Sequence, residues 1–222
     1  MKENKKFILA IPTLIIIVVT IIGISLIFYN RNLKEMSRED ARLLASKVID
    51  INNISCEIVT QNSLQSDVQD VVDYKMKDNK VISIDDSYTV FEDLSQKVKI
   101  QIDDSEKTAY VYSVYTDEIT NFQEMLYTAE KLLESEEYEY SFIDYETMNG
   151  IKCAAFSVAN ADTTFNIWLD RDNGMIVKME CHYKSSNDPS IDTTMYYRYQ
   201  LNVVTEDDVK QPELDGYTVV EL

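Results

Sequence analysis

The stretch TTFNIWLDRDNGMIVKMECHYK, residues 163–184, decides what kind of fold this chain can form. Two runs in which apolar and polar residues alternate flank the turn RDNG, residues 171–174. Alternation places successive side chains on opposite faces of a strand, and Asn-Gly supplies the positive φ angles of a tight turn. The stretch therefore predicts a β-hairpin with one apolar face and one mixed, outer face. The residues expected on the outer face, as a candidate partner-binding surface, are Trp168, Lys178, Glu180 and His182.

The rest of the chain extends this hairpin into a larger sheet. Residues 37–51 have apolar side chains at helical spacing, and Ser37 with Asp40 has the pattern of a capping box. Alternating runs follow, then a second helical pattern from Thr116 or Asp117 to residue 137, and then further alternating runs. Consecutive strands joined by short turns pair antiparallel. The predicted fold class is α+β, a curled antiparallel sheet or unclosed barrel packed on an N-terminal and a central helix.

A curled sheet packed on helices can enclose an apolar cavity between the two layers. The same inward-facing side chains would equally form an ordinary filled core, which is the simpler interpretation. The residues expected to line such a cavity are Val98, Ile100, Ile102, Phe165, Ile167, Met175, Val177, Tyr197 and Tyr199.

Residues 7–29 contain no charged side chain. At ~1.5 Å rise per residue, a helix of this length can cross a ~30 Å hydrocarbon core. No A-x-A-like cleavage site or lipobox cysteine follows, which favours an uncleaved signal anchor over a cleaved signal peptide. We therefore expect a single-pass protein of the cell membrane. Its predicted parts are a cytoplasmic N-terminus (1–6), a transmembrane anchor (7–29), a short linker (30–36) and an extracytoplasmic domain (37–222).

The composition excludes some partners and leaves one redox question open. A formal charge of −18 repels phosphate, so we expect no nucleic-acid partner. Acidity by itself indicates only solubility or a basic partner. The three cysteines, Cys56, Cys153 and Cys181, have no C-x-x-C spacing and fall at apolar positions of predicted strands. Buried free thiols are the favoured interpretation, and one disulfide remains the alternative.

The sequence offers little for catalysis. The single histidine, His182, is expected on the outer face, whereas the neighbouring Cys181 is expected on the opposite face, so the pair does not form a ready dyad. P-loop, G-x-S-x-G, G-x-G-x-x-G and H-E-x-x-H motifs are absent. DRDNG does not meet the spacing of a calcium loop. We expect no catalytic residue, no cofactor and no metal site.

The order helix, strands, central helix, strands resembles the bacterial lipoprotein-carrier fold of the LolA/LolB-like family. Over residues 37–222, the hairpin is similar to that family's pattern W-[IL]-D-x-x-[TN]-G-x-[IPV]-x-[KR]-x-E, and the ending VVTEDDVKQPELDGYTVVEL resembles the closing segment of Gram-positive members, with Val209 in place of Phe. A composition rich in Asn, Lys, Ile and Glu suggests a clostridial source. The positions that match the hairpin pattern are Trp168, Asp170, Gly174, Lys178 and Glu180.

In clostridia, this resemblance extends to germination lipoproteins of the GerS type, which implies a non-enzymatic partner of a cell-wall amidase in spores. This chain departs from that type because it has a membrane anchor in place of a lipobox cysteine. We expect a membrane-anchored binding module that regulates envelope or spore-cortex modification through a protein partner. A binder or sensor of an acyl chain or lipoprotein is the alternative, and an envelope enzyme is the least favoured reading.

Overall fold

The computed structural model describes residues 35–63, 69–113, 120–184 and 192–222. Over these residues, twelve strands form one sheet in the order β12-β6-β5-β4-β3-β2-β1-β11-β10-β9-β8-β7. Neighbouring strands are antiparallel apart from β12 and β6, which are parallel. Since β12 and β7 lie at opposite edges, the sheet does not close. The prediction of an unclosed, curled antiparallel sheet is confirmed.

The strands form two meanders, and β1 pairs with β11 to join them. The first meander consists of β1 (Asn53–Asn62), β2 (Gln69–Lys77), β3 (Lys80–Ile84), β4 (Tyr88–Asp93), β5 (Val98–Asp103) and β6 (Thr108–Ser113). The second consists of β7 (Glu139–Met148), β8 (Ile151–Ala159), β9 (Thr163–Asp170), β10 (Ile176–Tyr183) and β11 (Thr193–Leu201), and β12 (Thr218–Glu221) ends the chain.

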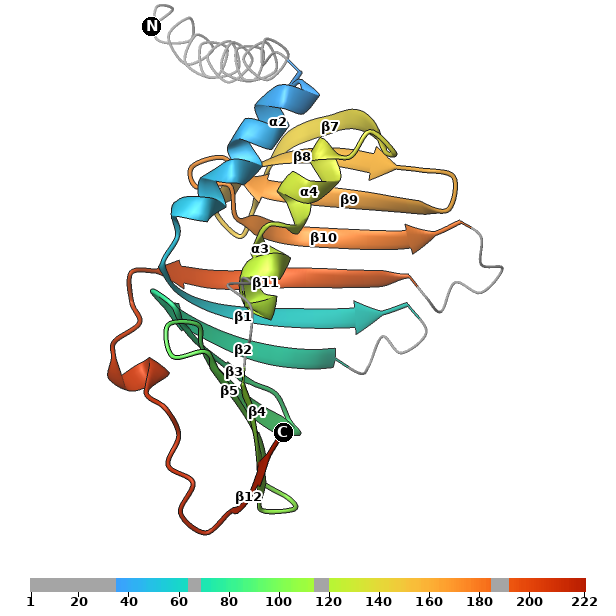
Figure 1. Cartoon of the computed structure of the whole chain (residues 1–222). Coiled ribbons are helices and arrows are strands. Elements are labelled where there is room, and N and C mark those ends of the chain that lie inside the picture. Colours follow the sequence, from blue (N-terminus) through green and yellow to red (C-terminus); the bar gives the residue numbers. More distant parts are fainter. Residues whose placement is uncertain (1–34, 64–68, 114–119, 185–191) are drawn as a thin grey trace, which may run out of the picture. The chain divides into compact units, whose positions relative to one another are not determined.

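The helical elements are short. They are α2 (Arg38–Ala45), η1 (Ser46–Asp50), α3 (Asn121–Leu126), α4 (Thr128–Glu134) and η3 (Asp207–Val209), where η denotes a 3-10 helix. Figure 1 shows α2, α3 and α4 across one face of the sheet. On that face the ring of Tyr74 in β2 stacks on Phe122 in α3, with ring centroids 4.5 Å apart. We call this the helix face and the opposite side the outer face.

The start of α2 fixes two helices together. The predicted capping box is present: Ser37 Oγ accepts from the Asp40 amide at 3.1 Å, and Asp40 Oδ2 accepts from the Ser37 amide at 3.4 Å. The Arg38 guanidinium donates to carbonyl oxygens at the end of α4, to Leu133 at 2.8 Å, to Tyr138 at 3.1 Å and to Ser135. The last carbonyls of a helix have no partner within the helix, so one arginine completes α4 and holds it against α2.

The central helix differs from its prediction. It is broken at Tyr127 into α3 and α4, and its N-cap is Thr120, whose hydroxyl accepts from the Gln123 amide at 3.1 Å. The predicted caps, Thr116 and Asp117, lie outside the described residues. Thr120 and Gln123 together form a capping box. This local sequence signal is as compatible with a helix start at Thr120 as the upstream residues are with a start at Thr116 or Asp117.

The buried apolar layer changes sides across the sheet. Residues in register share a face, and the row that contains Tyr74 continues through Ser83 and Val90 on the helix face. The adjacent row therefore lies on the outer face and contains Phe91 and Ile100. These large side chains are buried under the segment that leads to β12, where they form one cluster. Its members are Phe91, Ile100, Ile102 and Ala109, with Ile82, Val98, Val111, Leu214 and Tyr217 packed against them.

Polar contacts also hold this C-terminal segment (residues 203–217) to the first meander. Lys75 Nζ lies 2.8 Å from Asp208 Oδ1 in η3, a single helical turn. The Tyr217 hydroxyl donates to Asp104 in the turn after β5. Strands β4 to β6 thus have their main apolar cover on the outer face, whereas the helices cover β1, β2 and the second meander on the helix face.

Two predictions about the chain's environment have different outcomes. The proposed membrane anchor, residues 7–29, lies outside the described residues, and none of the helices that the structure describes is long and apolar enough to cross a membrane. All three cysteines are buried free thiols, as favoured from the sequence. Burial raises the pKa of the Cys56 thiol to about 12 and that of Cys153 to about 11.

Candidate binding site

The outer face of the second meander carries one continuous row of paired side chains. Val59 in β1 is opposite Tyr196 in β11, Tyr196 is opposite Lys178 in β10, and Lys178 is opposite Trp168 in β9. The described helices pack on the other side of these strands. This row therefore forms the centre of a surface that is separate from the core under the helices.

A β-bulge lies next to this row. The register between β9 and β10 shifts at Val177, between the pairs of Ile176 and Lys178. Pairing between β10 and β11 begins only at Lys178 and Tyr196, so the rest of β11 pairs with β1 alone. Bulges bend a strand and redirect its side chains. Here the bulge accompanies an opening between β10 and β11 on the outer face.

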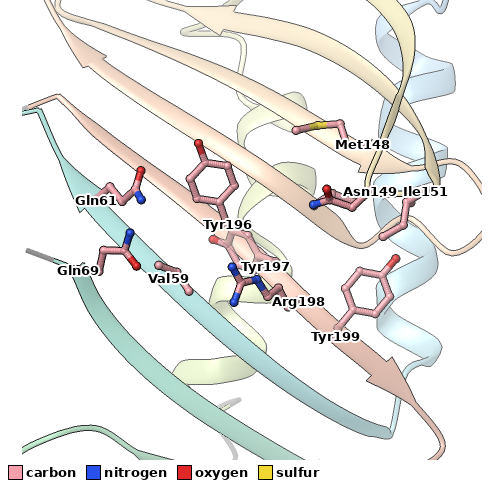
Figure 2. A pocket seen from close by; sticks show the side chains of 11 residues that line it. Val59, Gln61, Gln69, Met148, Asn149, Ile151, Tyr196, Tyr197, Arg198 and Tyr199 are labelled. Carbon is pink, nitrogen blue, oxygen red and sulfur yellow. The ribbon is translucent and has the colours of Figure 1, made fainter. Parts of the chain in front are cut away.

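A pocket of about 420 Å³ lies at this opening. Figure 2 shows Gln61 and Gln69 at one end, Asn149 and Ile151 from the β7–β8 turn at the other, and Tyr196 between them. Its size is within the ~300–1,000 Å³ range of small-molecule sites. The lining residues are Val59, Gln61, Gln69, Met148, Asn149, Ile151, Val177, Tyr196, Tyr197, Arg198 and Tyr199.

Most of the polar lining is uncharged. Arg198 is the one charged residue of the lining, and its Nη1 lies 2.6 Å from Glu57 Oε1 on β1. The amides of Gln61, Gln69 and Asn149 can each donate and accept hydrogen bonds. The pocket therefore combines paired charge, neutral hydrogen-bonding groups and apolar side chains.

Tyr199 ties the end of β11 to the β9–β10 turn. Its hydroxyl donates to Asp170 Oδ2, and Asn173 Nδ2 donates to the same hydroxyl at 3.3 Å. Burial, reinforced by the bond to Asp170, raises the pKa of Tyr199, and burial raises the pKa of Tyr197. Both phenols therefore stay neutral at physiological pH and act as hydrogen-bonding groups, not as bases.

The four residues predicted to share the outer face are brought together there. Trp168 is nevertheless 9% exposed, because its indole Nε1 donates to Glu146 and Lys178 Nζ lies 4.5 Å from the ring centroid. Trp168 thus packs against its cross-strand neighbour Lys178 and is largely covered. A partner approaching this face would meet Lys178 before the indole.

Charged groups continue along the same face. Lys178 Nζ and His182 Nε2 flank Glu180, the latter at 3.6 Å, and His182 Nδ1 lies 3.1 Å from Asp192 Oδ2. Burial acts to raise the pKa of Glu180, but hydrogen bonds from Lys178, Asn166 and His182 outweigh it and leave that pKa below 4.5. The contact with His182 is the main cause that lowers the pKa of Asp192. This strip is a network of contacts between acidic and basic side chains.

The arrangement around His182 does not present a nucleophile. Cys181 is in register with Thr193 and Phe165, whereas His182 shares the opposite face with Glu180. Burial also raises the pKa of the Cys181 thiol, which disfavours a thiolate. Within the described ranges, no group of three or more His, Cys, Asp or Glu residues could hold a metal ion.

The nine residues predicted to line one apolar cavity do not share a face, which corrects that prediction. Ile100 and Ile102 belong to the outer-face cluster under the C-terminal segment, whereas Ile167 is on the helix face, in register with Met179. Val177 packs with Trp168 on the outer face. Alternation shows which residues of a strand face the same way, but not which face of the sheet another segment covers. The remaining members are Val98 in the outer-face cluster, Phe165 and Tyr197 on the helix face, the fully buried Met175, and Tyr199 at the pocket.

Sequence reasoning missed most of the pocket. Alternation along TTMYYRYQL does place Tyr196 and Arg198 together, which is a usable signal. The contribution of Met148, Asn149 and Ile151 depends on how the β7–β8 turn folds over the outer face, for which no local pattern exists. The bulge at Val177 likewise has no marker such as glycine at its position.

No protein-family model and no curated protein sequence matches this chain. Solved structures with similar shape include MucB in complex with periplasmic MucA (TM-score 0.47, 13% identity, 83% of this chain and 63% of that one). Another is a putative outer membrane lipoprotein-sorting protein domain from Vibrio parahaemolyticus (TM-score 0.35, 12% identity, 78% of this chain and 97% of that one). A third is a LolA superfamily protein from Nitrosomonas europaea (TM-score 0.28, 11% identity, 77% of this chain and 97% of that one). The chain spans just under two thirds of the MucB chain, and none of these likenesses identifies its function.

Proposed function

We propose that this chain is a non-enzymatic binding module that presents the outer face of its second meander to a protein partner. The observation that carries the proposal is the row Val59–Tyr196–Lys178–Trp168, which lies beside an open pocket on the side of the sheet away from the helices. Tyr, Trp and Arg are the residue types that most often dominate protein interfaces. A polar, partly charged surface of this kind fits a partner that binds reversibly.

The setting of this module is also a proposal. The uncharged segment 7–29 supports a single-pass anchor in the cell membrane with an extracytoplasmic domain. The resemblance of the hairpin to LolA/LolB-like proteins supports a role in regulating envelope or spore-cortex modification, with a cell-wall amidase as the candidate partner. A net charge of −18 favours a partner with a basic contact surface.

An acyl-chain or lipoprotein binder remains the alternative function. This function is less favoured, because the side chains predicted to surround the acyl chain are distributed over both faces of the sheet. Ile100 and Ile167 have exposed fractions of 1% and 0%. They are core residues on opposite sides of one sheet. A cavity for a long acyl chain would require one of these packed layers to open.

The test is site-directed photocrosslinking in the native envelope with the full chain. A photoreactive amino acid replaces Arg198 on the outer face, and the matched control replaces Leu43, an exposed residue of α2. We expect a protein adduct from position 198 only. The captured protein, once purified, should bind the native chain, and Arg198→Glu should weaken that binding. Equal capture at both positions, or a captured protein that binds the variant equally well, would refute the proposal.

A further inference from the structure

The outer-face pocket has a chemistry that selects against ions and against long apolar chains. Its one charged lining residue, Arg198, is already paired with Glu57 at 2.6 Å. Asp170, which lies nearby, accepts from Tyr199 and Asn173. An ionic ligand would find Arg198 already paired and Asp170 already hydrogen-bonded, so ion pairing would contribute little to its binding.

An acyl chain also fits the pocket poorly. Three residues with amide side chains, Gln61, Gln69 and Asn149, contribute to the lining. Covering such groups with hydrocarbon leaves them without hydrogen-bond partners, at about 1–3 kcal/mol each. A suitable ligand must instead offer hydroxyl or amide groups at its edge and a small apolar surface.

A pyranose ring has these properties. Its C–H face packs on aromatic and aliphatic side chains, and its hydroxyls pair with groups that both donate and accept, as amides and phenols do. Tyr196 is placed between the amide end and the β7–β8 turn, in position to contact such a ring (Figure 2). Asn149 lies beside Met148 and Ile151 at that turn, so an amide and a small apolar surface occur together.

We infer that the pocket is a saccharide-binding site for a neutral glycan that contains N-acetylated hexosamine. The acetamido group supplies one methyl for the Met148 and Ile151 surface and one amide for Asn149. The sugar ring contacts Tyr196, and its hydroxyls pair with Gln61 and Gln69. The site goes beyond the proposed protein-partner function and does not depend on it.

The experiment is calorimetric titration of the full chain, in detergent, with the tetrasaccharide of β-1,4-linked N-acetylglucosamine. The comparison ligands are the corresponding glucose tetramer, dodecanoate and a tetralysine peptide. We expect binding of the N-acetylated tetramer, with the other three at least about tenfold weaker, which corresponds to about 1.4 kcal/mol. Tyr196→Ala should weaken that binding about tenfold.

Two further variants make the result independent of folding defects. Asn149 has a φ of +51°, so Asn149→Gly removes its amide without backbone strain and should weaken binding roughly fivefold. Tyr183→Ala removes an exposed tyrosine of β10 outside the pocket and should leave binding unchanged. No binding by the native chain, equal binding of the glucose tetramer, tighter binding of dodecanoate or tetralysine, or equal binding by Asn149→Gly would each overturn the inference. Because partner capture at position 198 is measured separately, failure here and failure of the protein-partner proposal are distinguishable.

Discussion

Replacing Gly174 by alanine tests how closely the helices approach the β9–β10 turn. Gly174 has a φ of +78°, and a Cβ at this position would lie 2.0 Å from the Leu44 carbonyl oxygen and 3.4 Å from Lys47 Cβ. Gly150, in the β7–β8 turn, has a φ of +86° and no atom within 4 Å of such a Cβ. The two glycines therefore share the backbone requirement but differ in their surroundings, which makes Gly150→Ala a matched control.

The magnitude follows from these two contributions. A positive φ destabilises a residue with a Cβ by about 1–2 kcal/mol. The reduced conformational entropy of the unfolded chain offsets about 0.4–1 kcal/mol of this. Gly150→Ala should therefore lower the free energy of unfolding by about 1 kcal/mol. Gly174→Ala must in addition move the end of α2 away from the turn by more than about 1 Å to restore ordinary contact distances. That shift disturbs the packing of buried Leu44 and Val48 and should bring the loss to about 3–4 kcal/mol.

Urea unfolding of the full chain, followed through the fluorescence of the single Trp168, measures both values. The expected result is a free energy of unfolding that falls about 2–3 kcal/mol further for Gly174→Ala than for Gly150→Ala. If the two variants differ by less than about 0.5 kcal/mol, then α2 does not contact the turn as described, and the argument from the Leu44 carbonyl is wrong.

Three other predictions concern single contacts. Arg38→Met should lower the free energy of unfolding in urea by about 2–3 kcal/mol, because the carbonyls of Leu133, Ser135 and Tyr138, at and just after the end of α4, lose the hydrogen bonds from this guanidinium; an unchanged value would contradict this capping role. The folded-state pKa of Glu180 lies below 4.5, so its carboxylate stabilises the fold above its unfolded-state pKa, and this contribution disappears as the pH falls through the folded-state value. When the free energy of unfolding in urea is measured at a series of pH values, it should therefore fall less for Glu180→Gln than for the native chain below about pH 4.5. Parallel plots of this free energy against pH for the two proteins would exclude the contribution. Burial raises the pKa of Cys56 to about 12 and that of Cys153 to about 11, so an aromatic disulfide reagent at pH 8 should modify them only at the rate of unfolding, and rapid modification of the native chain would show that they are accessible.

Local patterns predicted the elements of the fold because each depends on neighbouring residues. The capping box at Ser37 and the turn at Gly174 are short-range features; the capping box occurs as expected, and the turn is present, although Gly174 alone of the Asn-Gly pair has a positive φ. The face of the sheet that each meander buries was not predictable in this way. Alternation in β5 places Ile100 and Ile102 together, but their cover comes from Leu214 and a segment more than a hundred residues later.

The same limit applies to the candidate site. Period-two alternation was sufficient to place Trp168 opposite Lys178, and both lie on the outer face. It could not show that Lys178 and Glu146 would cover the indole. The pocket depends on a register shift at Val177 and on a turn from another hairpin, and both are set by long-range packing.

The division of the two faces also explains where a ligand can bind. In the first meander, the C-terminal segment covers the outer apolar cluster, and ion pairs such as Lys75–Asp208 hold it in place. In the second meander, the helices occupy the helix face. The outer face of the second meander is left with the bulge, the pocket and the Lys178–Glu180 ion pair. Since the charges of that pair already satisfy each other, we expect much of the affinity at this surface to come from shape, aromatic contact and neutral hydrogen bonds. The overall acidity of the chain then acts mainly on which partners approach.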